Sequence, residues 1–278
     1  GVFANITIVT ARSIFLMWIG ELISEYKISN GISLIIFAGI VSGLPQTIWS
    51  SILNYTPETL PTYIAFAVLS VIVIAGVVFI SEGERKIPVS YAKQVRGNKL
   101  YGGAMSYLPL RVNQAGVIPI IFAISILLFP QFIAQAAAIF SPNTSIQINN
   151  IVSSFYNNAI SYSAAYFILV VIFTFFYTAI TFDPQEISKN LQKSGGFVPG
   201  IRPGEHTSKY ISQIVYRTTL FGAIFLGLIA ILPNLTQIIT GIQSLTVGGT
   251  ALLIVVSVAL EIMKQLESQL VMREYDGI

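Results

Sequence analysis

The sequence predicts an all-α membrane protein, a polytopic bundle of transmembrane helices. Hydrophobic residues make up 54% of its 278 residues and charged residues only 10%, whereas an ordinary soluble domain has about 25% charged residues. The mean hydropathy is +0.75. A soluble protein of this size could not cover its surface with so few charges. The sequence contains no cysteine, which excludes disulfides, thiol catalysis and thiolate metal sites.

Seven apolar segments are long enough to cross a bilayer as helices, which takes about 20 mostly apolar residues. They lie near 2–19, 32–50, 62–81, 115–134, 161–182, 214–232 and 249–263. Helices are expected because lipid has no water to satisfy exposed backbone groups. The last segment continues into the amphipathic stretch EIMKQLESQL, which we expect to emerge into water.

Connections that contain lysine or arginine alternate with connections that have neither. The basic ones are 20–31, 82–114, 183–213 and the C-terminal tail, and the others are 51–61, 135–160 and 233–248. The positive-inside rule then places the basic connections and the C-terminus in the cytoplasm and Gly1 on the far side. No basic segment precedes the first span, so it is not typical of a signal peptide, and we expect further spans before Gly1.

Arg12 interrupts this pattern because it lies in the middle of the first predicted span. An arginine at this depth costs roughly 2.5–3.5 kcal/mol on insertion scales. Two interpretations are open. The helix is short or displaced and the arginine reaches the interface, or the side chain faces a polar seam or a polar neighbour.

The sequence lacks the motifs of membrane enzymes. It has no H-E-x-x-H metalloprotease motif and no Walker A motif, its single histidine, His206, lies in a connection, and Asp183 and Asp276 both lie outside the spans. We therefore expect no catalytic residues, no metal site and no cofactor. A small-solute secondary transporter is the main alternative, but transporters usually bury ionisable groups at mid-membrane, where only Arg12 qualifies. An intramembrane hydrolase would lack its catalytic groups.

Four long motifs carry a family resemblance. They are FLMWIGELISE (15–25) leading into NGISLIIFAGIVSGLP (30–45), YLPLRVNQAGVIPIIFA (107–123), DPQEISKNLQKSGGFVPGIRPGEHTSKYI (183–211) and GGTALLIVVSVALEIMKQLESQL (248–270). Together they resemble the bacterial SecY family, the central subunits of the Sec protein-conducting channel. The resemblance covers essentially the whole chain, and the loop tips, 46–62 and 131–160 are the least alike.

The resemblance implies a fold and a division of the chain. The family has ten spans in two five-span halves related by an inverted repeat, and the seven spans here resemble spans four to ten. The first three, including the plug helix, have no counterpart in this sequence. Residues 1–61 then hold the last two spans of the N-terminal half. Residues 62–278 form the five-span C-terminal half with the large cytoplasmic loops 82–114 and 183–213.

The resemblance also implies a function. It is a passive channel in the bacterial plasma membrane that conducts unfolded polypeptides and releases hydrophobic segments sideways into lipid, without being an enzyme. Expected partners are the membrane subunits SecE and SecG, the SecA ATPase, and the ribosomal RNA and proteins at the tunnel exit. Signal sequences, nascent chains and membrane lipid are further expected partners.

Residues 194–207, SGGFVPGIRPGEHT, form the first candidate contact site. Proline fixes φ and glycine permits positive φ, so this turn has little freedom and presents Arg202 at a fixed place. From the residues alone it could be a solvated structural loop, and His206 is expected to be exposed. The resemblance implies that Arg202 contacts the ribosome or SecA.

The connection 82–114 is the second candidate contact site. Its lysines and arginines attract phosphates, although charge that merely sets topology would produce the same pattern. The resemblance implies that Lys93, Arg96 and Lys99 at its tip meet the ribosome or SecA.

The fourth span carries a predicted gate. Gly116 and Pro119 weaken its backbone hydrogen bonding, and we expect a kink at Pro119, with Asn113 at the cytoplasmic end. Glycine and proline are also simply frequent in membrane helices. The resemblance implies that this helix forms one side of the lateral gate.

Four isoleucines form the last candidate site. Ile32 and Ile36 are four residues apart and share a helix face, and Ile121 and Ile254 lie on other spans. From the residues alone each is lipid-facing or packing filler. The resemblance implies that the four belong to a pore ring, for which stiff β-branched side chains are suited.

Overall fold

The computed structural model describes residues 2–26, 30–53, 56–57, 60–91, 94–96, 99–101, 105–140, 142–240 and 244–276. Its backbone contacts divide the chain into two compact units. Unit 1 contains Gly1–Val78 and Thr240–Ile278, and unit 2 contains Phe79–Ile239.

Unit 1 is helical. It contains α1 (Val2–Glu25), α2 (Gly31–Leu53), most of α3 (Leu60–Glu82) and α9 (Ser244–Asp276). α2 packs against both α1 and α9. Ser24 closes the turn between α1 and α2, because its hydroxyl donates to the carbonyl of Gly20 at 3.0 Å and accepts the amide of Gly31 at 2.9 Å. α9 runs through the last predicted span and the amphipathic stretch as one helix.

The described residues of unit 2 form further helices after the end of α3. They are α4 (Ile118–Phe140), α5 (Pro142–Asn157), α6 (Ala159–Thr181), α7 (Pro184–Lys193) and α8 (Glu205–Thr240). α4 packs against α5 and α6. α6 buries one stripe at helical spacing, formed by Ser163, Tyr166, Val170, Thr174 and Thr178.

α5 was not predicted, since it lies in the connection 135–160. Two hydrogen bonds fasten it to α4. The Ser145 hydroxyl donates to the carbonyl of Ala134 at 3.0 Å, and the Tyr156 hydroxyl donates to the carbonyl of Leu127. A polar helix of this kind is stable here because its apolar side finds a partner.

In the described part of the chain, six helical stretches are long and apolar enough to cross a membrane. They are Phe3–Glu25, Gly31–Ser50, Tyr63–Glu82, Ile118–Ala137, Ala159–Lys193 and Glu205–Leu235. Each contains most of one of the first six predicted spans, so the prediction of a polytopic helical membrane protein is confirmed. The seventh predicted span lies within α9, several of whose side chains fall outside the description.

Strands appear where the sequence analysis expected a loop. β1 (Glu84–Tyr91), β4 (Met105–Arg111) and β5 (Gly196–Phe197) form an antiparallel sheet in the order β4–β1–β5. β2 (Gln94–Arg96) pairs with β3 (Lys99–Tyr101) in a separate hairpin. Ile87 and Val89 are buried while Pro88 between them is exposed, which is the alternation of a sheet with one face on a core.

The prediction of a kink at Pro119 is wrong. α4 begins at Ile118, so Pro119 lies in the first helical turn. A proline there removes no helical hydrogen bond, and its fixed φ suits the helix start. The proline inside α4 is Pro130, which the sequence analysis did not single out.

Candidate functional site

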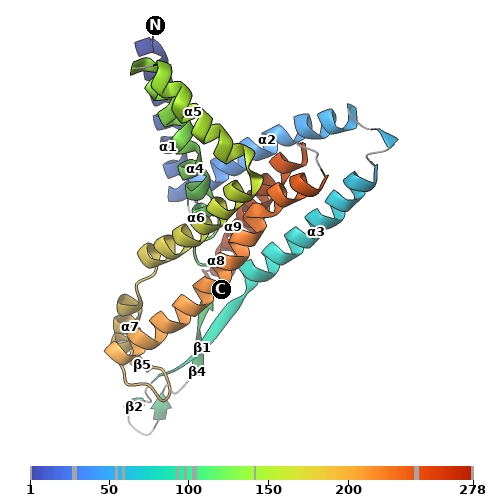
Figure 1. Cartoon of the computed structure of the whole chain (residues 1–278). Coiled ribbons are helices and arrows are strands. Elements are labelled where there is room, and N and C mark those ends of the chain that lie inside the picture. Colours follow the sequence, from blue (N-terminus) through green and yellow to red (C-terminus); the bar gives the residue numbers. More distant parts are fainter. Residues whose placement is uncertain are drawn as a thin grey trace. The chain divides into compact units, whose positions relative to one another are not determined.

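The two large basic connections fold together into one body, which we call the platform (residues 84–91, 105–111 and 184–215). It consists of β1, β4, β5, α7, the loop 198–204 and the start of α8 (Figure 1). β5 comes from the second connection and pairs with β1 of the first, with Ser90 opposite Phe197 and Tyr91 opposite Gly196. Two segments far apart in the sequence are therefore held as one surface.

The platform has its own hydrophobic core. Its buried members are Ile87, Leu110, Val198, Ile211 and Val215. Partly buried side chains surround them, namely Leu108, Phe182, Ile187, Leu191, Ile201, Tyr210 and Ile214. Each fully buried Val, Leu or Ile side chain contributes about 1.5–3 kcal/mol. The platform is therefore a packed element rather than a pair of loose loops.

α7 is a short helix whose ends are well specified. Asp183 caps it, with its Oδ1 accepting the amides of Gln185 at 2.8 Å and Glu186 at 3.4 Å, and Pro184 occupies the first position. Lys193 lies in the last turn, where the helix dipole favours a cation. The apolar face of α7 packs against the platform core through Ile187 and Leu191, and Lys193 is exposed.

Arg202 lies in the loop 198–204 and its side chain is exposed. Gly200 and Gly204 have φ of 82° and 94°, in the left-handed region that favours glycine, and they bracket the arginine. The positive φ that the sequence predicts for glycines of this turn is confirmed at these two positions. Among the described residues, no side chain bonds to the Arg202 guanidinium.

His206 is exposed as predicted, although it lies in the first turn of α8 rather than in a loop. Next to it, Lys209 pairs with Glu205 at 2.8 Å. Both partners are exposed, and surface pairs of this kind contribute little stability.

Exposed cations are spread over the platform. They are Arg85, Lys86, Arg111, Lys189, Lys193, Arg202 and Lys209. Guanidinium and ammonium groups of this kind can bind phosphate or carboxylate. Of the predicted tip residues, Arg96 of β2 and Lys99 of β3 are backbone partners in the strand register, and Lys93 lies outside the described residues.

The predicted gate residues lie at the junction between β4 and α4. The Asn113 side-chain amide donates to the carbonyl of Gly116 at 3.3 Å, and Gly116 has φ of 62°. Pro119 is fully buried. In the described part of the chain, the side-chain oxygens of Asn113 and Gln114 are buried without a hydrogen-bond partner. Sequence analysis did not single out Gln114, since an isolated amide carries no pattern.

Three of the predicted ring residues belong to unit 1. Ile32 and Ile36 lie on α2 and Ile254 on α9, the helix that packs against α2. Ile254 is buried, Ile36 is half-buried and Ile32 is exposed. Ile121 is half-buried on α4, in unit 2. Arg12 is exposed on α1.

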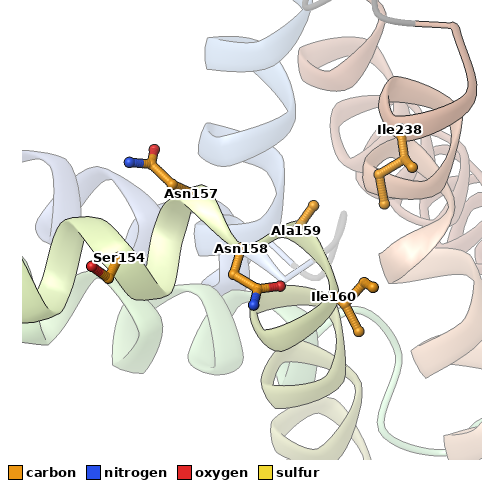
Figure 2. A pocket seen from close by; sticks show the side chains of 6 residues that line it. All are labelled: Ser154, Asn157, Asn158, Ala159, Ile160 and Ile238. Atoms are coloured by element: carbon orange, nitrogen blue, oxygen red, sulfur yellow. The ribbon is translucent and has the colours of Figure 1, made fainter.

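A shallow hollow of about 630 Å³ lies where α5 meets α6. Ser154, Asn157, Asn158, Ala159, Ile160 and Ile238 line it (Figure 2). Figure 2 shows Ile238 on a separate helix, across from the α5–α6 junction. The lining has amide and hydroxyl groups but no titratable side chain, so it provides no acid–base chemistry.

The sequence family is clear from comparison with known proteins. The SecY family model matches residues 1–263. The protein translocase subunit SecY of Thermus thermophilus is 47% identical, over 94% of this chain and 59% of that protein. The same subunit of Mycobacterium tuberculosis is 44% identical, over 98% of this chain and 62% of that protein.

The chain thus spans about three fifths of the length of these relatives. Among solved structures, a protein-conducting channel matches with a TM-score of 0.61 and 22% identity, over 92% of this chain and 62% of that one. This likeness shows a shared fold. Because the SecY family model matches residues 1–263 of the 278 in this chain, the chain belongs to the SecY family.

Proposed function

We propose that this chain forms part of a Sec protein-conducting channel, which passes unfolded polypeptides across the membrane and releases hydrophobic segments sideways into lipid. The match of the SecY family model to residues 1–263 carries this proposal. In this role the chain does no chemistry of its own, and the driving force comes from partners. Its division into family halves would fall at residues 61 and 62.

The platform is the proposed docking surface for the ribosome or the SecA ATPase. Its exposed cations suit ribosomal phosphates and acidic side chains. Arg202 is the best-presented of them, because its backbone is held between two left-handed glycines. Lys93, Arg96 and Lys99 would extend the same surface. SecE and SecG would contact the membrane-spanning helices.

The proposed location is the bacterial plasma membrane, with the platform and the C-terminus in the cytoplasm. The alternation of basic and non-basic connections supports this orientation. α5 would then lie on the outer side. Asn113, Gly116 and Pro119 would belong to the lateral gate through which signal sequences leave, since they lie at the junction between β4 and the first turn of α4.

A chimera tests the function. This chain replaces the matching segment of the Thermus thermophilus subunit, in cells depleted of their own channel, and export of a signal-bearing reporter is measured. Restored export supports a channel subunit, whereas a small-solute transporter would restore none.

Arg202→Glu in this chimera tests the docking surface. We expect export to fall at least about tenfold, because the variant loses one or more charge-assisted hydrogen bonds to the partner. Lys193→Glu is the matched control, since it reverses a charge on the same platform and should have a smaller effect. Normal export by well-expressed Arg202→Glu protein would contradict the assignment.

The pore ring is proposed for Ile32, Ile36, Ile121 and Ile254. Apolar side chains that meet in a constriction exclude water and ions. Ile254→Asn in the chimera should therefore raise ion leak and relax the demand for a good signal sequence. Ile72→Asn, on an exposed position of α3, should affect insertion without passing ions. Equal conductance in the two variants would show that Ile254 is ordinary packing.

A further inference from the structure

The loop that carries Arg202 rests on two hydroxyl groups that come from the helices on either side. Ser188 of α7 and Thr207 of α8 are buried, with 3% and 2% of their surfaces exposed. The Ser188 hydroxyl donates to the carbonyl of Gly204 at 2.7 Å. The Thr207 hydroxyl donates to the carbonyl of Arg202 itself at 2.9 Å.

These two bonds act on the carbonyls of Arg202 and Gly204, the residues on either side of Pro203. The Gly204 carbonyl also accepts the amide of Ser208 at 3.1 Å, the first backbone bond of α8, so it is tied to both helices. At the other end of the loop, the Ile201 amide donates to the carbonyl of Val198 at 3.1 Å, and Val198 lies in the platform core. The backbone of Arg202 is therefore fixed from both directions.

Fixing the backbone matters for a contact residue. An arginine side chain that binds a partner loses rotamer freedom, and a mobile loop would lose backbone freedom as well. A loop that is already ordered avoids that second loss and binds more tightly. The glycines at 200 and 204 make the conformation accessible, but glycine also leaves many other conformations open, so something else must select this one.

We propose that Ser188 and Thr207 are positioning residues for Arg202. Their hydroxyls hold the carbonyls of Arg202 and Gly204 and so aim the exposed guanidinium at its partner. This inference rests on the proposed role of Arg202 in docking. Neither residue stands out in the sequence, because each acts on a backbone carbonyl and leaves no motif.

A spin label measures the effect on the loop without any transport assay. The chain contains no cysteine, so Arg202→Cys gives a single attachment site for a nitroxide, and it keeps the backbone carbonyl that Thr207 contacts. The labelled chain is studied in lipid nanodiscs by electron paramagnetic resonance. We expect Thr207→Val and Ser188→Ala each to lower the ratio of ordered to mobile label by about three- to tenfold, the range for one hydrogen bond. Thr207→Ser keeps the hydroxyl and should restore the ordered spectrum.

Matched controls come from hydroxyls that bond within their own helix segment. Thr218 donates to the carbonyls of Ile214 and Val215, and Ser194 donates to those of Asn190 and Leu191. Thr218→Val and Ser194→Ala should leave the label at position 202 unchanged. If the label in Thr207→Val and Ser188→Ala is as ordered as in the chain without these changes, the proposal is overturned. It is also overturned if Thr218→Val and Ser194→Ala mobilise the label as much as Thr207→Val and Ser188→Ala do.

A second measurement links the loop to docking. With Arg202 present, SecA-driven export into vesicles that contain the chimera is measured at increasing SecA concentration. Thr207→Val should raise the SecA concentration for half-maximal export by about three- to tenfold with little change in the maximal rate, and Thr207→Ser should behave like the parent. The positioning role is overturned by one combination of results. In that combination Arg202→Glu inactivates the chimera and Thr207→Val makes the loop mobile, yet Thr207→Val leaves the SecA concentration for half-maximal export unchanged. If Arg202→Glu has no effect, the docking assignment fails and the positioning role fails with it, while the spin-label result still reports whether the hydroxyls order the loop.

Discussion

α3 and β1 follow each other directly in the chain, yet they treat their apolar side chains in opposite ways. Ile72 of α3 is 61% exposed, whereas Ile87 of β1 is 1% exposed. Ile64, Val68 and Val71 of α3 are exposed like Ile72. Val89 of β1 is buried like Ile87. Only one residue, Gly83, separates the two elements.

The difference follows from the solvent of each element. Lipid tails are as apolar as leucine, so an isoleucine on a membrane helix gains little from a protein contact. In water the same side chain is stabilised by burial against a core, because the hydrophobic effect arises from removing apolar surface from water. An exposed isoleucine is therefore ordinary on α3, whereas an isoleucine of the platform gains free energy when it is buried in the core.

Cysteine labelling should show the largest difference between the two regions. Ile72→Cys and Met105→Cys both place a thiol on an exposed site, at 61% and 74% exposure. A charged, membrane-impermeant maleimide needs a thiolate in water, and hydrocarbon excludes it. We expect rapid labelling at 105 from the cytoplasmic side and none at 72 from either side.

Asn149→Cys, on the exposed side of α5, sets the orientation and should be labelled only from outside. Labelling at 105 and 149 from the same side would overturn the proposed topology. Equally fast labelling at 72 and 105 would show that α3 faces water, and the comparison between α3 and the platform would fail.

Truncation of the platform core should have the next largest effect. Ile211 is fully buried in this core, so Ile211→Ala should destabilise the platform by about 2–5 kcal/mol. The rate of proteolysis within residues 184–215 at rising denaturant measures the local opening. Ile72→Ala removes the same atoms from an exposed position and should leave that rate unchanged. Equal sensitivity of the two variants would mean that the platform lacks a core of its own.

A glycine pair gives the smallest expected effect. A Cβ on Gly222 of α8 would lie 2.8 Å from the carbonyl oxygen of Val112, so Gly222→Ala should cost about 1–3 kcal/mol. Gly39→Ala on α2 meets nothing within 4 Å and should be neutral or stabilise the helix by up to about 1 kcal/mol. Thermal unfolding in lipid nanodiscs compares them. If Gly222→Ala leaves the stability unchanged, the backbone at Val112, just after β4, can shift to make room for the added methyl group at little cost.

The membrane-spanning helices and the basic connections were predictable from the sequence. Both depend on local composition. About 20 apolar residues in a row suffice for a span, and the charge of a connection is given directly by its residues. The exposure of His206 and the left-handed glycines beside Arg202 were also predictable, because charged and polar residues in a connection usually face water, and glycine permits positive φ wherever it occurs.

Only the tertiary structure decided the rest. The pairing of β5 with β1, the attachment of α5 to α4 and the bonds from Ser188 and Thr207 each need a partner from a distant or differently folded segment. Strand formation depends on such partners more than on intrinsic preference, so 82–114 looked like a loop. The start of α4 at Ile118, and with it the role of Pro119, likewise follows from β4 and the junction before the helix. Composition determines which segments enter lipid, and packing determines how the segments in water hold their shape.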